Sequence, residues 1–240
     1  MKCKFIHFYC RAGDEDMVKI LLDFGADINK QNSLGNTALY LAAENDNLVL
    51  VEFLVKEKGA QIDGDEPGDK PGVTPIMIAA IKGHTEIVRF LMQADASLKN
   101  RDENDHTILH LAAMNNRHEV LAVLADKNEE LVAKLAKMPN NMENTALHLA
   151  AQAGHLETVR ELLKEVYKPD VDNKNWDEQT PSHLAAAKGH SEVLGLLLHN
   201  DPNSIFDKDE EDNTPLHLAA KNKQSSTVGT LLAAGKLISE

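Results

Sequence analysis

The chain has 240 residues, of which 42% are hydrophobic but only 4% aromatic, so its core must consist mainly of small and aliphatic side chains. Its 38 acidic and 25 basic residues give a formal net charge of −13, which argues against binding to nucleic acid or anionic lipid, because both are bound through Lys and Arg. The two cysteines make no disulfide framework, no apolar run is long enough to span a membrane, and no signal peptide opens the chain. Together these features predict a reducing, cytoplasmic location.

A threonine-containing stretch recurs along the whole chain. Its threonines are 37, 33, 38, 35 and 34 residues apart, and a degenerate earlier copy starts at Phe5. Because a period of this length is typical of stacked repeats, we predict a single array of seven copies. The six clear copies read NTALYLAAEND from 36, VTPIMIAAIKG from 73, HTILHLAAMNN from 106, NTALHLAAQAG from 144, QTPSHLAAAKG from 179 and NTPLHLAAKNK from 213. The seven copies occupy approximately residues 1–32, 33–69, 70–102, 103–140, 141–175, 176–209 and 210–240.

Each copy predicts a helix that starts directly after its threonine. A threonine hydroxyl can accept from the free N–H groups of a helix N-terminus. In three copies Pro75, Pro181 or Pro215 follows, where a missing N–H costs least. Paired alanines later in the same helix allow neighbouring helices to approach closely. Cys10 takes the second alanine position of the first copy, so we expect it to be a small buried residue rather than a reactive thiol.

The second helix of each copy is predicted to carry one apolar stripe. Val159, Leu162 and Leu163 have the spacing of a single helix face, which only a neighbouring copy can cover. These features, with the Thr-Pro-Leu-His-x-Ala-Ala pattern, resemble the ankyrin repeat over essentially the whole chain. The resemblance implies an all-α fold, an α-solenoid of stacked helix-turn-helix units with projecting β-hairpin-like fingers.

Histidine recurs at two positions of the copies, one within the first helix and one directly after it. In the ankyrin family these rings bridge backbone groups of loops and adjacent repeats, so the resemblance assigns them to the scaffold. Tyr40 and Met77 replace the first ring in two copies, and equivalent rings in stacked layers are about 10 Å apart, too far to share a metal ion. We therefore predict no catalytic residue, metal or cofactor here. The residues assigned to the scaffold are Thr107, His110, Thr145, His148, His155, Thr180, His183, His190, Thr214 and His217.

The finger tips vary between copies, and the resemblance places recognition there and on the exposed first-helix residues of the concave side. The family has glycine two residues before the threonine, and only Gly35 and Gly72 match. Because glutamate tolerates left-handed backbone poorly, we expect the other turns to differ from the usual hairpin. Those turns carry Asp105, Glu143, Glu178 and Asp212.

Trp176 is the only tryptophan and falls at a tip, where it either covers its own and the neighbouring finger or anchors a partner. Met142 and Met114 could extend it into an apolar strip, and His106 either contacts a partner or faces solvent.

The acidic runs 63–69 and 207–212 lack the EF-hand ligand pattern and are interpreted as solvated loops, with a basic partner or, last, a metal ion as the alternatives. The candidate partner-binding residues are Trp176, Met142, Met114, His106, Asp177, Glu210, Glu211 and Lys188.

Two insertions interrupt the period. Residues 59–75 are rich in Gly, Pro and Asp and predict a longer finger. Residues 125–145 contain Leu131, Val132, Leu135 and Ala136 at helical spacing, which predicts an extra or lengthened helix that stops before Pro139.

No phosphate-binding loop, dinucleotide fingerprint, nucleophile elbow, zinc-protease motif or CxxC pair occurs, so the sequence predicts no enzyme. The preferred hypothesis is a protein-interaction scaffold that binds a basic or apolar protein or peptide on its concave side. One alternative is the cytosolic ankyrin region of a membrane protein, such as a transient-receptor-potential ankyrin-type channel or a plant ankyrin-membrane protein. Another is a pathogen effector that mimics a host ankyrin adaptor. Asn29 is similar to asparagines that ankyrin proteins present for hydroxylation.

Overall fold

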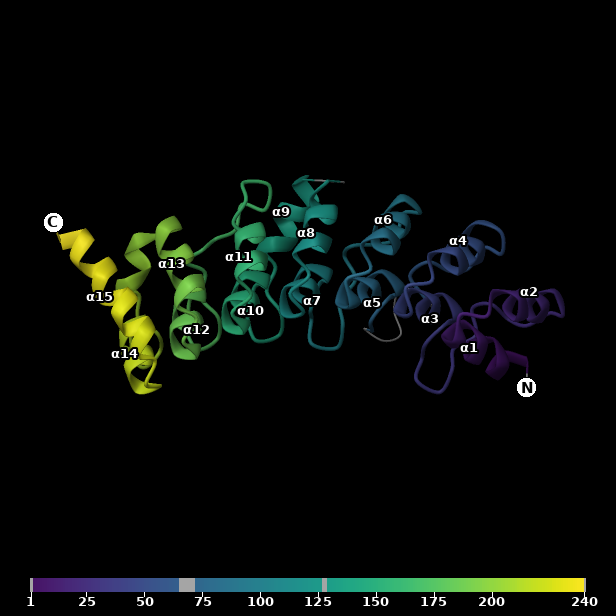
Figure 1. Cartoon of the computed structure of the whole chain (residues 1–240), viewed down its shortest axis with the longest axis horizontal. Coiled ribbons are helices and arrows are strands. Elements are labelled where there is room, and N and C mark those ends of the chain that lie inside the picture. Colours follow the sequence, from purple (N-terminus) through teal and green to yellow (C-terminus); the bar gives the residue numbers. More distant parts are fainter. Residues whose placement is uncertain (1, 65–71, 127–128, 240) are drawn as a thin grey trace. The chain divides into compact units, whose positions relative to one another are not determined.

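The computed structural model describes residues 2–64, 72–126 and 129–239, with side chains from residue 5 to residue 236 (Figure 1). Two compact units are distinguished, Met1–Glu103 and Asn104–Glu240. The first contains α1 (Lys2–Ala12), α2 (Glu15–Asp23), α3 (Ala38–Glu44), α4 (Leu48–Lys56), α5 (Pro75–Lys82) and α6 (Thr85–Gln93). The second contains α7 (Ile108–Met114), α8 (His118–Ala125), α9 (Glu129–Lys137), α10 (Ala146–Ala153), α11 (Leu156–Leu162), α12 (Pro181–Lys188), α13 (Ser191–Asn200), the 3₁₀ helix η1 (Pro202–Phe206), α14 (Pro215–Lys221) and α15 (Ser225–Ser239).

Each copy folds as an inner helix followed by an outer helix, as the repeated pattern predicts. Within the second unit α10 packs between α7 and α12, and α11 packs between α8 and α13. Within the first unit α3 packs between α1 and α5. Helices therefore stack on their counterparts in the adjacent copies of the same unit, which confirms the all-α repeat fold. None of the described residues forms a strand, and the fingers are hydrogen-bonded turns.

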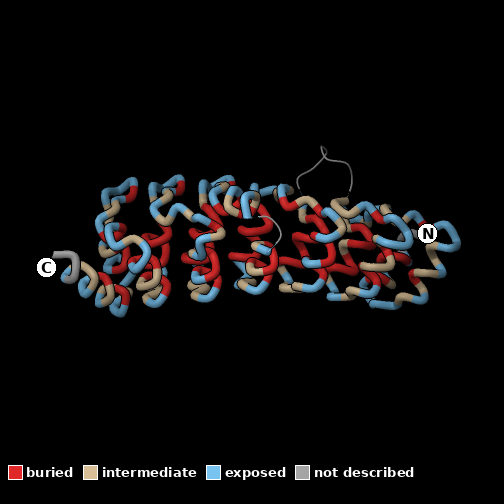
Figure 2. The backbone as a smooth tube through the Cα atoms, turned by 90° about the horizontal axis from the view of Figure 1, so that it is seen from above, coloured by how far each residue is buried: buried red, intermediate tan, exposed pale blue. Residues whose placement is uncertain are grey.

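The alanine pairs lie where the inner helices meet. Ala150 and Ala151 of α10 are both 0% exposed, as are the corresponding alanines of α3 and α12. Cys10 is likewise fully buried, and burial raises the pKa of its thiol to about 12, so the prediction of a small buried residue is confirmed. Buried residues follow the inside of the helix pairs, whereas the loops carry most of the exposed residues (Figure 2).

The insertion after α8 forms a helix. Glu129–Lys137 is helical and buries Val132, Leu135 and Ala136, while Pro139 lies beyond its end. The predicted helix is confirmed. Its acidic first turn and basic last turn also suit the direction of the helix dipole.

The predicted longer finger over 59–75 and the tip at 69–73 fall largely on residues 65–71, outside the described residues. Asp63, the first carboxylate of that acidic run, accepts a hydrogen bond from the Ser97 N–H at 3.0 Å. Burial raises the pKa of Asp63 above its usual value. This carboxylate therefore ties two loops of the same unit together.

Among the described residues, Tyr167 is the largest fully buried side chain, although it lies in the turn after α11. Its hydroxyl donates to the Leu121 carbonyl of α8 at 2.5 Å. Nothing in the repeat pattern indicates this residue, because the corresponding turns of the other copies carry no tyrosine.

None of the described helices is both long and apolar enough to cross a lipid bilayer.

Candidate interaction surface

Four of the described finger turns are each closed by one Asn or Asp side chain. The Asn140 Oδ1 accepts from the Met142 N–H at 2.9 Å and from the Asn144 N–H at 3.0 Å. The Asn140 N–H donates to the Asn144 carbonyl at 2.9 Å. The same arrangement recurs at Asn32, Asn175 and Asp209. The short polar side chain thus replaces water at the turn and fixes the finger.

Left-handed backbone occurs at the same position of every described tip. Gly35 has φ 83°, and Glu143 and Glu178 have φ 57° and 56°. The N–H of Glu143 donates to Asn140 at 3.0 Å, as that of Gly35 does to Asn32 at 3.1 Å. The expectation that turns without glycine would differ from the usual hairpin is therefore wrong. The hydrogen bonds of the turn hold Glu143 and Glu178 in the same left-handed backbone conformation as Gly35. Asp105 and Asp212 share it.

This strain yields a prediction for Glu143. Left-handed backbone costs an L-residue about 1–2 kcal/mol, and glycine avoids this cost. Glycine also loses more conformational entropy on folding, which cancels part of the gain. Glu143→Gly should therefore raise the free energy of unfolding by about 0.5–1 kcal/mol, measured by urea denaturation. Glu157→Gly, in the first turn of α11, should lower stability instead. A loss of stability in both variants would contradict the strain argument.

Neighbouring fingers of the second unit are joined by backbone hydrogen bonds. The Asn141 N–H donates to the Asn104 carbonyl at 3.1 Å, and the Trp176 N–H donates to the Met142 carbonyl at 3.3 Å. The Glu210 N–H donates to the Asp177 carbonyl at 3.2 Å. Each finger is thereby held in register with the next.

In the second unit, three inner-helix histidines each link their copy to the following finger. The Thr145 N–H donates to Nδ1 of His148 at 3.2 Å, and Nε2 of His148 lies 3.0 Å from the Gln179 carbonyl. Since a carbonyl only accepts and an N–H only donates, the ring is neutral with its proton on Nε2. Burial lowers the pKa of His148 to about 4, against smaller raising contributions from backbone hydrogen bonds. His110 and His183 make the corresponding contacts to Asn144 and Asn213.

The second set of histidines links each copy to the preceding one. Nε2 of His155 lies 3.1 Å from the Met114 carbonyl, and Nε2 of His190 lies 3.0 Å from the Gln152 carbonyl. Both carbonyls are at the ends of inner helices, where backbone oxygens lack helical partners. The ring of His190 also lies against Gly154, whose φ is 75° and whose added Cβ would be 2.5 Å from Nδ1.

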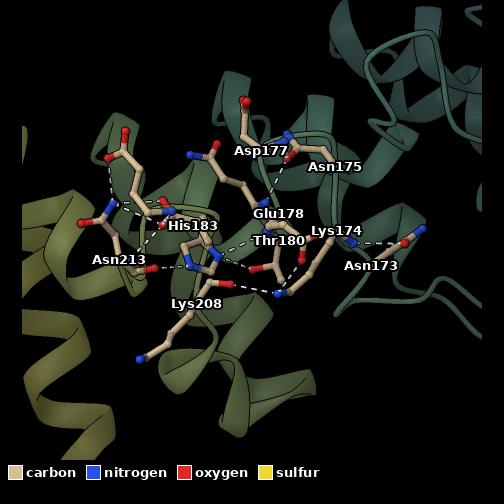
Figure 3. Close-up of polar contacts among 12 residues, drawn as sticks. Asn173, Lys174, Asn175, Asp177, Glu178, Thr180, His183, Lys208 and Asn213 are labelled. Carbon is tan, nitrogen blue, oxygen red and sulfur yellow. Dashed lines mark hydrogen bonds and ion pairs between the residues drawn. The ribbon is translucent and has the colours of Figure 1, made fainter.

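Figure 3 shows how one such junction is assembled. His183 lies between Thr180 and Asn213, and Lys174 reaches both Glu178 of its own finger and the Lys208 carbonyl of the next. The Lys174 Nζ is 3.1 Å from Glu178 and 2.9 Å from Lys208. Sequence reasoning missed Lys174, although its spacing of four residues from Glu178 suits an ion pair.

Trp176 and Met142 lie on adjacent, bonded tips and are 62% and 47% exposed. Met114 is 42% exposed but is the last residue of α7, so it is not a finger residue. Leu34, at the tip position of Met142 in the first unit, is 74% exposed. Sequence reasoning missed Leu34, which alignment of the tips would have indicated.

The last two tips are acidic, and lysines neutralise them only in part. Lys208 pairs with Asp212 at 3.1 Å, and Lys221 pairs with Glu211 at 3.3 Å. Asp177 and Glu210 are exposed, and within the part of the chain that the structure describes neither forms an ion pair. Lys188 is exposed as the last residue of α12. The fingers that carry Trp176 and Glu210 therefore present exposed carboxylates that form no ion pair among the described residues.

Sequence profiles of one family match most of the chain. A profile of three ankyrin repeats matches residues 61–134, 93–175, 121–205 and 147–239, and a profile of many copies matches 6–55. The chain is an ankyrin-repeat protein.

Several ankyrin proteins are similar to it. Rabankyrin-5 of Mus musculus is 28% identical over 163 residues, which cover 66% of this chain and 13% of Rabankyrin-5. Neurogenic locus notch homolog protein 1 of Xenopus laevis is 30% identical, over 60% of this chain and 5% of its own length. A Caenorhabditis elegans homolog of transient receptor potential cation channel subfamily A member 1 is 30% identical, over 52% and 10%. The chain thus spans a small part of each of these relatives.

One candidate ankyrin tip residue is not on the surface. His106 is only 8% exposed, and its ring centroid is 5.8 Å from that of His110. The interpretation of His106 as a partner or solvent contact is corrected, because the ring packs inside the finger base.

Among the described residues, no group of three or more His, Cys, Asp or Glu side chains is placed to hold a metal ion. Asp209 of the second acidic run is 8% exposed, and its Oδ1 accepts hydrogen bonds from the backbone N–H groups of Glu211 and Asn213. The run therefore shapes its own turn.

Proposed function

We propose that this ankyrin array is a non-catalytic interaction scaffold whose finger face, defined as Met142, Trp176, Asp177 and Glu210, binds a protein or peptide. The observation that carries the proposal is the exposed Trp176 ring on a finger that is bonded to its neighbours on both sides. A surface ordered before binding loses little conformational entropy when a partner arrives. Exposed tryptophan is also among the side chains that most often dominate binding energy.

The chemistry of the finger face favours a basic partner with an apolar or cationic group for the indole. Asp177 and Glu210 lie on bonded tips on either side of the junction and lack ion pairs among the described residues. A guanidinium can stack on tryptophan and pair with a carboxylate at once. An arginine-containing segment therefore suits this face.

Trp176→Ala should weaken such binding by more than about 1 kcal/mol, roughly fivefold, and leave the thermal midpoint nearly unchanged. Peptides enriched from a displayed random library on the purified chain would provide the ligand, with affinity measured by fluorescence polarisation. Phe206→Ala is the matched control, because Phe206 is 61% exposed but lies in η1.

The proposal predicts that enriched peptides are basic and lose affinity only with the Trp176 variant. Equal affinity for wild type and Trp176→Ala, or a large stability loss with unchanged affinity, would contradict it.

A second candidate function is the non-membrane arm of a channel-type protein. The similarity to the Caenorhabditis elegans channel homolog, and 29% identity to transient receptor potential cation channel subfamily V member 1 of Cavia porcellus, favour it. Sequencing the parent transcript tests this candidate. Several long apolar spans in the same reading frame would support it, and their absence would contradict it.

A further inference from the structure

Backbone hydrogen bonds between the fingers pair residues of like chemistry. The Trp176 N–H donates to the Met142 carbonyl, so two exposed apolar residues of adjacent fingers are neighbours. The Glu210 N–H donates to the Asp177 carbonyl, which makes two exposed acidic residues neighbours in the same way. We name these pairs the apolar junction, Met142 and Trp176, and the acidic junction, Asp177 and Glu210.

A third pair precedes them in the second unit. The Asn141 N–H donates to the Asn104 carbonyl, and both residues are exposed. This amide junction, Asn104 and Asn141, carries side chains that can both donate and accept hydrogen bonds. Along the fingers the junctions therefore follow in the order amide, apolar and acidic.

The acidic junction keeps its charge. Lys174 pairs with Glu178, and the Asp177 side chain points away from this pair (Figure 3). In the part of the chain that the structure describes, neither Asp177 nor Glu210 forms an ion pair. A cationic side chain of a partner can therefore make a charge-assisted hydrogen bond at this junction.

The spacing of the junctions selects the conformation of a partner segment. Each junction belongs to one layer of stacked helix pairs, so neighbouring junctions are about 8–10 Å apart, the distance between packed helices. In a polyproline II helix every third residue lies on the same side, about 9 Å apart, because there are three residues per turn. In a β-strand the residues of one side are about 7 Å apart, which does not match. A polyproline II segment can therefore present one residue to each junction.

An α-helix has a matching repeat, but its chemistry does not suit these junctions. Residues seven apart in an α-helix are about 10 Å apart along its axis. A short helix is stabilised on a partner by burying an apolar stripe, and only one of the three junctions is apolar. Its carbonyls are also mostly paired within the helix, whereas those of polyproline II are free to accept from the side chains of Asn104 and Asn141.

We propose that the finger face binds a polyproline II segment that carries an apolar and a basic residue three positions apart. The apolar side chain contacts the apolar junction, and the basic side chain pairs with the acidic junction. Free backbone carbonyls of the segment accept hydrogen bonds from the amide junction. This inference rests on the proposed function, because it specifies the class of partner for the same face.

Peptides of one composition test the spacing. The probe is Pro-Pro-Pro-Leu-Pro-Pro-Arg, synthesised also in the reverse order so that both chain directions are covered. Its isomer Pro-Pro-Pro-Leu-Pro-Arg-Pro, with the corresponding reversed peptide, has the same charge but turns the arginine away from the acidic junction. Binding is followed by the fluorescence of Trp176, the only tryptophan of the chain. In the direction that binds more tightly, the probe should exceed its isomer by about tenfold in affinity.

Glycine in place of every proline of the probe tests the conformation. The glycine peptide keeps the spacing but has no preformed polyproline II structure, so it should bind about fivefold more weakly. A probe that does not bind, that binds no more tightly than its isomer, or that binds more weakly than the glycine peptide would overturn the inference. The proposed function would survive such a result if basic peptides from the random library still lost affinity with Trp176→Ala, and would fail if they did not.

A double-mutant cycle assigns the apolar residue to its junction. Met142→Ala should weaken binding of the probe by about threefold and leave binding of a probe with alanine for leucine unchanged, because both changes remove the same contact. Met114→Ala is the matched control, since Met114 is 42% exposed at the end of α7, and it should change neither affinity. Additive losses in the Met142 cycle would overturn this assignment.

Charge reversal assigns the basic residue. A chain with both Asp177→Lys and Glu210→Lys should bind a probe with glutamate for arginine more tightly than the original probe, because the junction is then basic. Circular dichroism checks that this chain is folded. A folded chain that still prefers the arginine probe would show that the basic residue binds elsewhere and would overturn the proposed register.

Discussion

Replacing Tyr167 with alanine is expected to lower the free energy of unfolding by about 3–5 kcal/mol, the range for removing a large buried ring. The side chain is 0% exposed, and its hydroxyl donates to the Leu121 carbonyl of α8. Tyr167→Phe keeps the ring and removes the hydrogen bond, so it should cost only about 1 kcal/mol. Urea denaturation followed by circular dichroism measures both.

The control for Tyr167 is Phe206→Ala, which removes an aromatic side chain that is 61% exposed and should change stability little. Equal losses for the Tyr167→Ala and Phe206→Ala variants would show that the Tyr167 ring does not hold the α11 turn against α8.

Stability is expected to fall as the pH drops from 6.5 towards 4, largely through His148. The folded pKa of His148 is about 4 against a usual value of 6.5, chiefly because the ring is buried. Between these values the unfolded chain binds a proton that the folded chain does not, so the stabilisation is complete above pH 6.5 and is lost as the pH falls to 4. The loss from this one residue is about 3 kcal/mol. Burial also lowers the pKa of His183, which adds to the loss in the same direction.

His148→Gln should reduce this pH dependence, although the variant is less stable at every pH. The quantity to compare is the slope of unfolding free energy between pH 6.5 and 4, obtained from urea titrations at several pH values. His199→Gln is the matched control, because His199 is exposed near the end of α13 and outside the repeated positions. If the His148→Gln variant had the same slope as the wild type, the His148 ring of the wild type would not be the source of the pH dependence, and the prediction would be wrong.

The fold was predictable because the repeat places the same local chemistry at each helix start. Thr145 and His148 form a capping box at the start of α10, and the same pair recurs at α7, α12 and α14. The inserted helix α9 was predictable for a similar local reason, since its apolar residues are spaced for one face. Such signals lie within a few residues and need no knowledge of distant contacts.

The sequence failed where contacts outside the repeated helix pattern decide the structure. Tyr167 gives no periodic signal because its partner is 46 residues away in α8. Glu143 was expected to distort its turn, but the Asn140 hydrogen bonds outweigh its intrinsic preference. His106 was expected outside because it is off the repeated positions, yet the finger base buries it. The finger face stays a proposal, since recognition depends on the residues that vary between copies.

The histidine links have a consequence for behaviour under load. His110, His148 and His183 each join one copy to the finger of the next, about one repeat further along the chain. Tension applied to the two ends of the second unit would pass through these links in series, and nearest-neighbour stacking lets a copy open without the whole unit opening at once. Stretching this unit should therefore give a ladder of small extension steps, each close to one repeat in contour length, rather than a single rupture.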